Sequence, residues 1–223
     1  MKPTLIFCAA KNKRYVEISI NAGFLYGAQL PNKVYYPPYF VDQDWKNPNL
    51  ESYVEALKEY QPYMASVMDW ERPEQLPEIL KWAEAIVPFV EVIMIVPKVQ
   101  NSISSLKKKI CGKSVRLGYS VPTIYGGTAL PYSDFIGWPI HLLGGSPHKQ
   151  MKLTGFLNVV SIDGNMHMKM AELCTFWSRD KGIRGHWIGL NEIGDNDWGK
   201  DAPYEAFRRS CVNIMNAWNI LGR

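Results

Sequence analysis

Eight short apolar runs recur along the chain and constrain its fold more than any other feature. Each run is continuous, without regular alternation with polar residues, which is typical of parallel strands buried on both faces. Polar loops and helix-like segments separate most of them, and strand–helix alternation favours a parallel α/β fold. The runs are LIFCAA (5–10), FLYGAQ (24–29), YFVD (39–42), MASVMD (64–69), VEVIMIV (90–96), VRLGYS (115–120), IHLLGG (140–145) and VVSID (159–163).

A count of eight runs favours a closed barrel over an open sheet. We predict a single (β/α)8 TIM-type barrel over residues 1–223, since such barrels need roughly 200 residues. An open, doubly wound sheet would carry a glycine-rich phosphate loop after its first strand, and the segment CAAKNKRY has no glycine. The gap between the second and third runs is too short for a full helix, so we expect the barrel to be irregular there.

Helical spacing or helix-start signals occur between the runs. They predict helices over residues 14–22, 50–60, 73–86, 102–110, from 146 onward, 167–176 and 204–221. Pro77 suggests a late start or a kink in the third of these. Residues 177–203, rich in Gly, Asp and Asn, are predicted to form a long loop after the eighth strand–helix unit, serving as a lid or as a substrate-contacting insertion.

Composition sets few further limits. Hydrophobic residues make up 47% of the chain, which indicates a globular protein, and the formal charge of +4 permits a polyanionic partner without requiring one. The four cysteines are scattered without a C-x-x-C pair, which argues against a zinc knuckle or a redox motif and favours a reducing compartment. Cys8 and Cys174 are expected to be buried thiols. No apolar stretch reaches the length of a signal core or a membrane span, so we expect a soluble, cytoplasmic protein.

Three aspartates, Asp42, Asp69 and Asp163, each end an apolar run. In barrels of this class the chemistry lies at the C-terminal ends of the strands, so these carboxylates are expected to share one rim. Carboxylates that converge shift one another's pKa values and can bind a divalent metal, transfer protons or attack covalently. Each aspartate can alternatively cap the helix that follows it.

Other strand-end residues suit ligand binding. Gly144 and Gly145 allow a ligand to approach the backbone closely, or simply form a tight turn. His148 suits contact with a phosphate or a base, or an ordinary surface position. Lys11, Lys13 and Arg14 follow the first run, where phosphate contact and a solvated charge cluster are equally consistent with the sequence.

Four of these segments together resemble the tRNA-guanine transglycosylase superfamily. They are most similar to its short phage branch, which inserts 7-deazaguanines into DNA. The stretch from YFVD to MASVMD resembles the family's strand–Asp–helix–strand–Asp unit, and VRLGYS resembles its glycine-containing pocket strand. HLLGGSPHKQ resembles the family's glycine-rich turn, and VVSIDGN lies about as far downstream of that turn as the family's nucleophilic aspartate.

This resemblance implies specific roles. Asp163 would be the nucleophile, Asp42 the general acid and base, and Asp69 the residue that reads the guanine-like base. Gly118 and Tyr119 would line the base pocket, and Gly144 and Gly145 would admit the flat base against the backbone. The family's glutamine on the fifth strand has no clear match, and Lys98 or Gln100 is expected to replace it. Phosphate contacts would come from Lys11, Lys13, Arg14, His148 and Lys149.

The departures from the family refine the prediction. The tRNA enzymes carry a zinc site of clustered Cys and His after the nucleophile, and this sequence has no such cluster, so we expect no metal and no cofactor. The tRNA-holding elements are missing as well, which favours DNA over tRNA as the partner, together with a free 7-deazaguanine base. We therefore predict a base-exchange glycosyltransferase (a pentosyltransferase) without membrane attachment, in the host cytoplasm if phage-encoded.

Several alternatives stay open on the sequence. They are a tRNA-guanine transglycosylase, a nucleic-acid N-glycosidase without exchange, a metal-dependent hydrolase, and a non-catalytic barrel that binds nucleic acid. The hydrolase is disfavoured because few histidines, only His148 and His167, lie near the strand ends. Convergence of the three aspartates in one pocket is the observation that separates the enzymes from the binding module.

Overall fold

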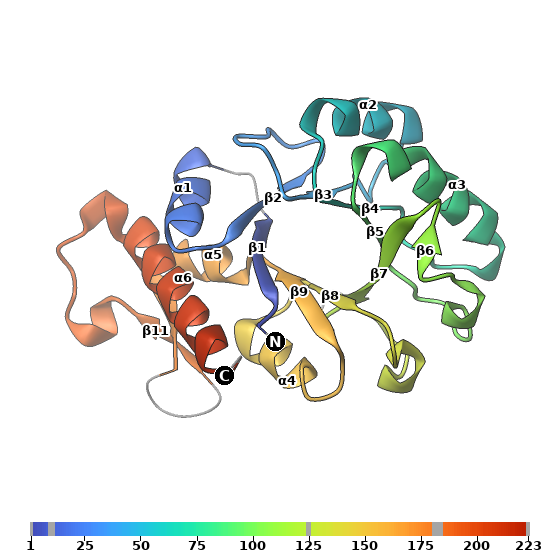
Figure 1. Cartoon of the computed structure of the whole chain (residues 1–223). Coiled ribbons are helices and arrows are strands. Elements are labelled where there is room, and N and C mark those ends of the chain that lie inside the picture. The colour runs from blue at the N-terminus through green and yellow to red at the C-terminus, as the bar shows by residue number, and fades with distance from the viewer. Residues whose placement is uncertain (1, 9–11, 124–125, 180–184, 222–223) are drawn as a thin grey trace.

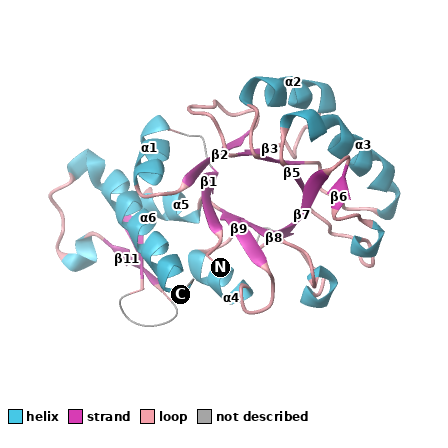
Figure 2. Cartoon of the chain, viewed as in Figure 1, coloured by secondary structure: helices cyan, strands magenta, loops and turns pink. Residues whose placement is uncertain are grey.

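Eight parallel strands close into a barrel in the computed structural model, which describes residues 2–8, 12–123, 126–179 and 185–221. Figure 2 looks into the ring that they form. The first strand pairs with the last, and β5 pairs with β7, so the ring has no open edge. The barrel strands are β1 (Thr4–Cys8), β2 (Leu25–Gln29), β3 (Phe40–Asp42), β4 (Met64–Ser66), β5 (Val92–Ile95), β7 (Lys113–Ser120), β8 (Ile140–Leu143) and β9 (Val159–Asp163). The predicted (β/α)8 barrel is confirmed, and every barrel strand coincides with one of the apolar runs.

Helices cover the outside of the barrel (Figure 1). They are α1 (Lys13–Asn21), α2 (Leu50–Tyr60), α3 (Leu76–Ile86), α4 (Pro147–Leu153), α5 (Met166–Ala171) and α6 (Ala202–Leu221). The Asn49 side chain begins α2 by accepting a hydrogen bond from the Ser52 backbone N–H at 3.0 Å. Pro77 lies in the first turn of α3, which starts after a 3-10 turn at Pro73–Gln75, so the predicted late start is correct. The β2–β3 connection has no helix, as expected.

The predicted helix over residues 102–110 is wrong. A 3-10 turn at Ile103–Ser105 is followed by β6 (Lys109–Ile110), which pairs antiparallel with the start of β7. Cys111 (φ 46°) and Gly112 (φ 84°) both adopt left-handed backbone conformations and turn the chain back within two residues. The run of lysines therefore lies beside a hairpin and does not end a helix.

The predictions for residues 167–203 are only partly correct. Helix α5 ends at Ala171, and β10 (Thr175–Ser178) pairs antiparallel with β11 (His186–Gly189) where a helix end and a long loop were expected. Phe176 and Trp177 are buried in this hairpin, which packs against α6 outside the barrel (Figure 1). Burial of these two rings explains why residues 175–178 form strand β10. The segment is thus anchored to the barrel's outer layer.

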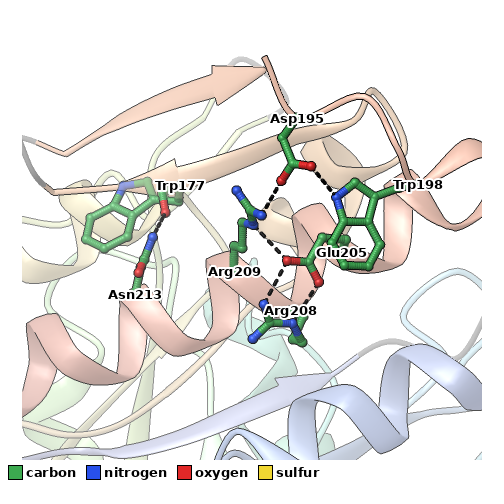
Figure 3. A network of polar contacts seen from close by, with 7 residues as sticks. All are labelled: Trp177, Asp195, Trp198, Glu205, Arg208, Arg209 and Asn213. Atoms are coloured by element: carbon green, nitrogen blue, oxygen red, sulfur yellow. Dashed lines mark hydrogen bonds and ion pairs between the residues drawn. The ribbon is translucent and has the colours of Figure 1, made fainter. Parts of the chain in front are cut away.

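A polar network fixes the rest of this segment to α6 (Figure 3). Glu205 is buried and accepts hydrogen bonds at 2.7 Å from Arg208 and from Arg209. Arg209 also pairs with Asp195, whose carboxylate accepts a hydrogen bond from the Trp198 indole at 2.7 Å. The buried Glu205 carboxylate therefore has charged partners, which offset the cost of its burial.

The barrel is filled by side chains and is not a pore. Alternate strand residues point inward, and the apolar ones are Ile6, Cys8, Phe40, Met64, Val92, Met94 and Val96. Gly118 also faces inward, where an added Cβ would lie 2.7 Å from Val96 Cγ2. The larger core lies between the strands and the helices. Cys8 is buried as expected, whereas Cys174 is only half-buried. Within the described ranges, no helix is long and apolar enough to cross a membrane.

Candidate active site at the C-terminal end of the barrel

Asp42 is the last residue of β3 and belongs to the inward-facing set that includes Phe40. Its Oδ1 accepts a hydrogen bond from the Ser66 hydroxyl at 2.7 Å, and Ser66 Oγ in turn accepts one from the Gln43 backbone N–H. Burial raises the pKa of Asp42 to about 7; the Ser66 hydrogen bond opposes this shift, and the charges of Asp163 and Asp69 add to it. The three predicted carboxyl groups therefore interact electrostatically, and Asp42 is able to exchange a proton near neutral pH.

Asp163 is the buried last residue of β9. Its Oδ1 accepts a hydrogen bond from the Gly144 backbone N–H at 3.0 Å. The Gln150 amide of α4 donates to the carbonyl oxygens of both Gly144 and Asp163, at 2.7 and 2.8 Å. The glycine-rich turn after β8 is thus clamped to the end of β9. This clamp fixes the direction of the Asp163 carboxylate.

Cys8, the last residue of β1, lies within hydrogen-bonding reach of the Asp163 carboxylate. Burial raises the pKa of its thiol well above the usual range, and the charges of Asp163 and Asp42 raise it further. The thiol therefore stays protonated and acts as a donor to the carboxylate, not as a nucleophile. The sequence predicted a buried thiol here but not its contact with Asp163.

Asp69 and Lys98 form an ion pair at the same rim, after β4 and β5. Lys98 Nζ lies 2.6 Å from Asp69 Oδ2 and 3.1 Å from Glu71 Oε1. Burial alone would lower the pKa of Lys98, but the contacts with the two carboxylates outweigh it and raise that pKa overall. A fixed positive charge therefore stands beside the acidic groups and offsets part of their repulsion.

These groups surround a cavity of about 330 Å³. Its wall includes Asp42, Asp69, Lys98, Gly144 and Gly145, and its volume is within the range of small-molecule sites. Trp45 also lines it and is 59% exposed, so an indole face is available for stacking. The expected convergence of three aspartates in one pocket holds for Asp42 and Asp69 only, because Asp163 is not part of this wall. It lies behind Gly144, from whose N–H it accepts a hydrogen bond, and lines a separate, much smaller pocket. Trp45 was not predicted; its signal in the sequence is an aromatic residue three positions after a strand-end aspartate.

A larger cavity, of about 450 Å³, lies outside the barrel between the β2–β3 connection and α2. It touches the first cavity at Gln43, a buried residue whose Oε1 has no hydrogen-bond partner in the described part of the chain. Its wall contains none of the strand-end aspartates that interact with one another. Of these two cavities, the smaller one is the one lined by strand-end aspartates, Asp42 and Asp69.

Some predicted pocket residues lie away from the cavity. Tyr119 faces outward and packs against Tyr132 and Phe135, with ring centroids 5.9 and 5.2 Å apart; burial raises its pKa to about 12. Gly118 is covered by Val96 and Leu143, so it makes room for their side chains. Gln100 is exposed in a turn after β5. Of the two candidates for the fifth-strand position, Lys98 is the one at the cavity.

The predicted phosphate-binding residues are spread over α1 and α4. Arg14 pairs with Asp201 at 2.6 Å and covers the Tyr204 ring, and Lys13 lies 3.5 Å from Glu17. Lys149 is exposed and donates a hydrogen bond to the Pro122 carbonyl at 3.0 Å. His148 Nδ1 lies 3.4 Å from Ser146 Oγ. Lys11 falls outside the described residues.

Three polar residues inside the barrel were not predicted. Arg116, His141 and Ser161 occupy inward positions on β7, β8 and β9 beneath the cavity. Their signal in the sequence is a polar residue within a continuous apolar run. Across the described ranges, no group of three or more His, Cys, Asp or Glu residues is arranged to hold a metal ion.

Comparison with known proteins gives a family but no activity. No curated protein matches the chain. One family matches residues 19–219, a span that starts within α1 and ends within α6, and it is described as a family of unknown function (DUF6610). The chain therefore belongs to the DUF6610 family.

Proposed function

We propose that this protein is a base-exchange glycosyltransferase that replaces guanine in DNA with a 7-deazaguanine. The observation that carries the proposal is the presence, at the C-terminal end of the barrel, of two unlike carboxyl groups that interact electrostatically. Asp42 has its pKa raised to about 7, while Asp163 is oriented by the Gly144 N–H. One group suited to proton transfer beside one suited to attack is the arrangement that retaining glycosyl transfer needs.

The reaction consists of two displacements at the anomeric carbon. An Asp163 oxygen attacks C1′ of the target deoxyguanosine, the C1′–N9 bond breaks, and its electron pair passes to the guanine, which takes a proton from Asp42. The 7-deazaguanine then binds and returns a proton from its N9 to Asp42. Its N9 attacks C1′, and the Asp163 carboxylate leaves. Protons and charge balance over the two steps.

The remaining cavity residues suit recognition of a flat base. Asp69 offers carboxylate oxygens to the N–H groups of a guanine-like edge, and Lys98 holds that carboxylate in place. Trp45 supplies a stacking surface at the cavity wall. The target nucleotide has to leave the duplex stack to reach a barrel mouth. DNA is favoured over tRNA because the sequence lacks the clustered Cys and His of the tRNA enzymes.

Incorporation of a labelled 7-deazaguanine into DNA tests the proposal. The wild-type protein is expected to incorporate the label, and Asp163→Asn is expected to abolish incorporation while it keeps a native melting temperature. Asp197→Asn, an exposed aspartate on the segment that follows β11, is the matched control and should retain full activity. Wild-type protein that incorporates no base into DNA or tRNA would refute base exchange. Release of guanine by water without incorporation would identify an N-glycosidase instead.

A further inference from the structure

A column of three polar side chains fills the barrel beneath Asp163. The Arg116 guanidinium donates a hydrogen bond from Nη1 to Ser161 Oγ at 2.8 Å. Ser161 Oγ lies 2.7 Å from His141 Nδ1, and His141 Nε2 lies 3.6 Å from Asp163 Oδ1. His141 and Ser161 are fully buried. The column therefore runs from an arginine in the barrel interior to the proposed nucleophile without exposure of its two middle members.

The direction of each hydrogen bond follows from the arginine. A guanidinium only donates, so Ser161 Oγ accepts from Arg116 and its own hydrogen is free to point elsewhere. His141 Nδ1, 2.7 Å away, can take this hydrogen, because a neutral imidazole has one accepting nitrogen. With Nδ1 accepting, the ring proton resides on Nε2. The nitrogen that carries this proton lies 3.6 Å from Asp163 Oδ1, close enough for an electrostatic contact but longer than a hydrogen bond.

The opposite tautomer is disfavoured at both ends of the ring. A proton on Nδ1 would give Ser161 Oγ two donors and would leave its hydroxyl hydrogen without this acceptor. It would also place the Nε2 lone pair against the Asp163 carboxylate. Nε2 has no hydrogen-bond partner in the described part of the chain, and Asp163 Oδ1 lies 3.6 Å from it. Because an unpaired buried donor or acceptor is costly, an Nε2 proton facing this carboxylate is favoured over an Nε2 lone pair.

We propose that Arg116, Ser161 and His141 are positioning residues that hold His141 as the Nε2–H tautomer and thereby orient the Asp163 carboxylate from below. The role assigned to Asp163 rests on the proposed function. Gly144 and Cys8 approach the same carboxylate from the turn after β8 and from β1. His141 adds a donor from inside the barrel. Within the described ranges, Arg116 forms no ion pair with a carboxylate. Its hydrogen bond to Ser161 is the first link of the column, and the approach of His141 to Asp163 is the last.

The tautomer can be measured without substrate. Two-bond ¹H–¹⁵N correlation spectra of protein labelled at its four histidines report which ring nitrogen is protonated, and His141→Gln assigns the signal by its disappearance. We expect a single proton on Nε2 of His141 in the wild type, and a mixture of tautomers in Ser161→Ala, which removes the donor to Nδ1. A proton on Nδ1 in the wild type, alone or with one on Nε2, would overturn the inference.

Steady-state exchange measures the consequence for catalysis. His141→Leu removes the donor to Asp163 and is expected to lower kcat about tenfold or more, with the KM for the free base unchanged. His141→Gln keeps an amide donor on a side chain of similar reach and should recover part of that loss. If His141→Leu does not fold, the smaller Ser161→Ala change carries the test, with a drop in kcat and an unchanged KM. Wild-type kcat in both variants overturns the positioning role, whereas absence of exchange in the wild type refutes only the proposed function.

Discussion

The Ser66 hydroxyl donates a hydrogen bond to Asp42 Oδ1 at 2.7 Å and joins the ends of β3 and β4. This bond lowers the pKa of Asp42 against the larger effect of burial, and the balance of the two places that pKa at about 7. The pKa of the proposed general acid is therefore set by a neighbouring strand as well as by its own depth in the barrel.

Asp42→Asn is expected to change how stability depends on pH. The folded-state pKa of about 7 lies above the ordinary value of 3.8, so the native state binds more protons than the unfolded state between these values. The contribution of Asp42 is fully present below about pH 4 and is lost as the pH rises through 7. Converted to free energy, this pKa shift makes Asp42→Asn roughly 2–4 kcal/mol more stable than the wild type at pH 8. At pH 4 the two proteins should be nearly equal in stability.

Urea unfolding of both proteins between pH 4 and pH 8 measures this difference. Asp44→Asn is a suitable control for the loss of a carboxylate at this rim, because Asp44 lies two residues away, beyond the end of β3. A constant difference between Asp42→Asn and the wild type across the range would contradict the raised pKa.

Lys98→Met is expected to weaken binding of the incoming base. Removing the ammonium leaves the Asp69 and Glu71 carboxylates without this partner at the rim, and Asp69 loses its fixed orientation. The KM for the free base should rise about tenfold, while kcat changes little, because the pair lies away from the reacting bond. Lys81→Met, on the exposed face of α3, is the control. A fall in kcat with unchanged KM would place Lys98 in the chemical step instead.

Gly145→Ala and Gly144→Ala form a matched pair. Both glycines have left-handed backbone conformations, with φ of 81° and 65°. A Cβ at Gly145 would lie 2.4 Å from Val121 Cγ1, whereas a Cβ at Gly144 would meet no atom within 4 Å. Gly144→Ala should cost about 1 kcal/mol of stability from backbone strain alone, and Gly145→Ala about 2–4 kcal/mol. Thermal unfolding measures both, and equal destabilisation would show that the Val121 contact relaxes freely.

Glu205→Gln is expected to destabilise the hairpin layer. Hydrogen bonds from Arg208 lower the pKa of this buried carboxyl, burial raises it, and those from Arg209 lower it again, for a net decrease. Its contribution is therefore present above about pH 4.5 and is lost as the pH falls through the lowered value. At pH 7 the variant should lose roughly 1–3 kcal/mol, because two guanidinium groups lose a charged partner.

The comparison variant for this network is Arg208→Gln. The Arg208 side chain is 54% exposed, so its replacement should lower the free energy of unfolding by less than about 1 kcal/mol. Unfolding followed by tryptophan fluorescence measures both losses, and Trp177 and Trp198 are two of the eight tryptophans that contribute to the signal. Equal losses for the two variants would show that burial of Glu205 does not set the energetics.

The barrel itself was predictable because strands buried on both faces leave continuous apolar runs. The strand-end aspartates were predictable for the same reason, since each follows such a run. The hairpin at Cys111 and Gly112 was missed because lysines beside it imitate a helix end. The burial of Trp177 against α6 depends on residues more than 30 positions away, beyond any local pattern.

The interior column was harder to see than either of these. In a run that is apolar on both faces, no alternation shows which residues point into the barrel. No periodic signal therefore marked Arg116, His141 and Ser161. Their side chains come together only because the closed barrel points all three into its interior. The pairing of Asp69 with Lys98 is similar, because the two residues are brought together by neighbouring strands.

The hydrogen-bonded ladder between β1 and β9 has a consequence for synthesis of the chain. The first strand cannot complete its pairing until the segment ending at Asp163 has left the ribosome. Until then β1 has one unpaired edge, and so does the growing end of the sheet, a state that invites pairing with other chains. Assembly of the nascent protein is thus governed by a contact between distant parts of the sequence, and Asp163 reaches its place at the moment the ring closes.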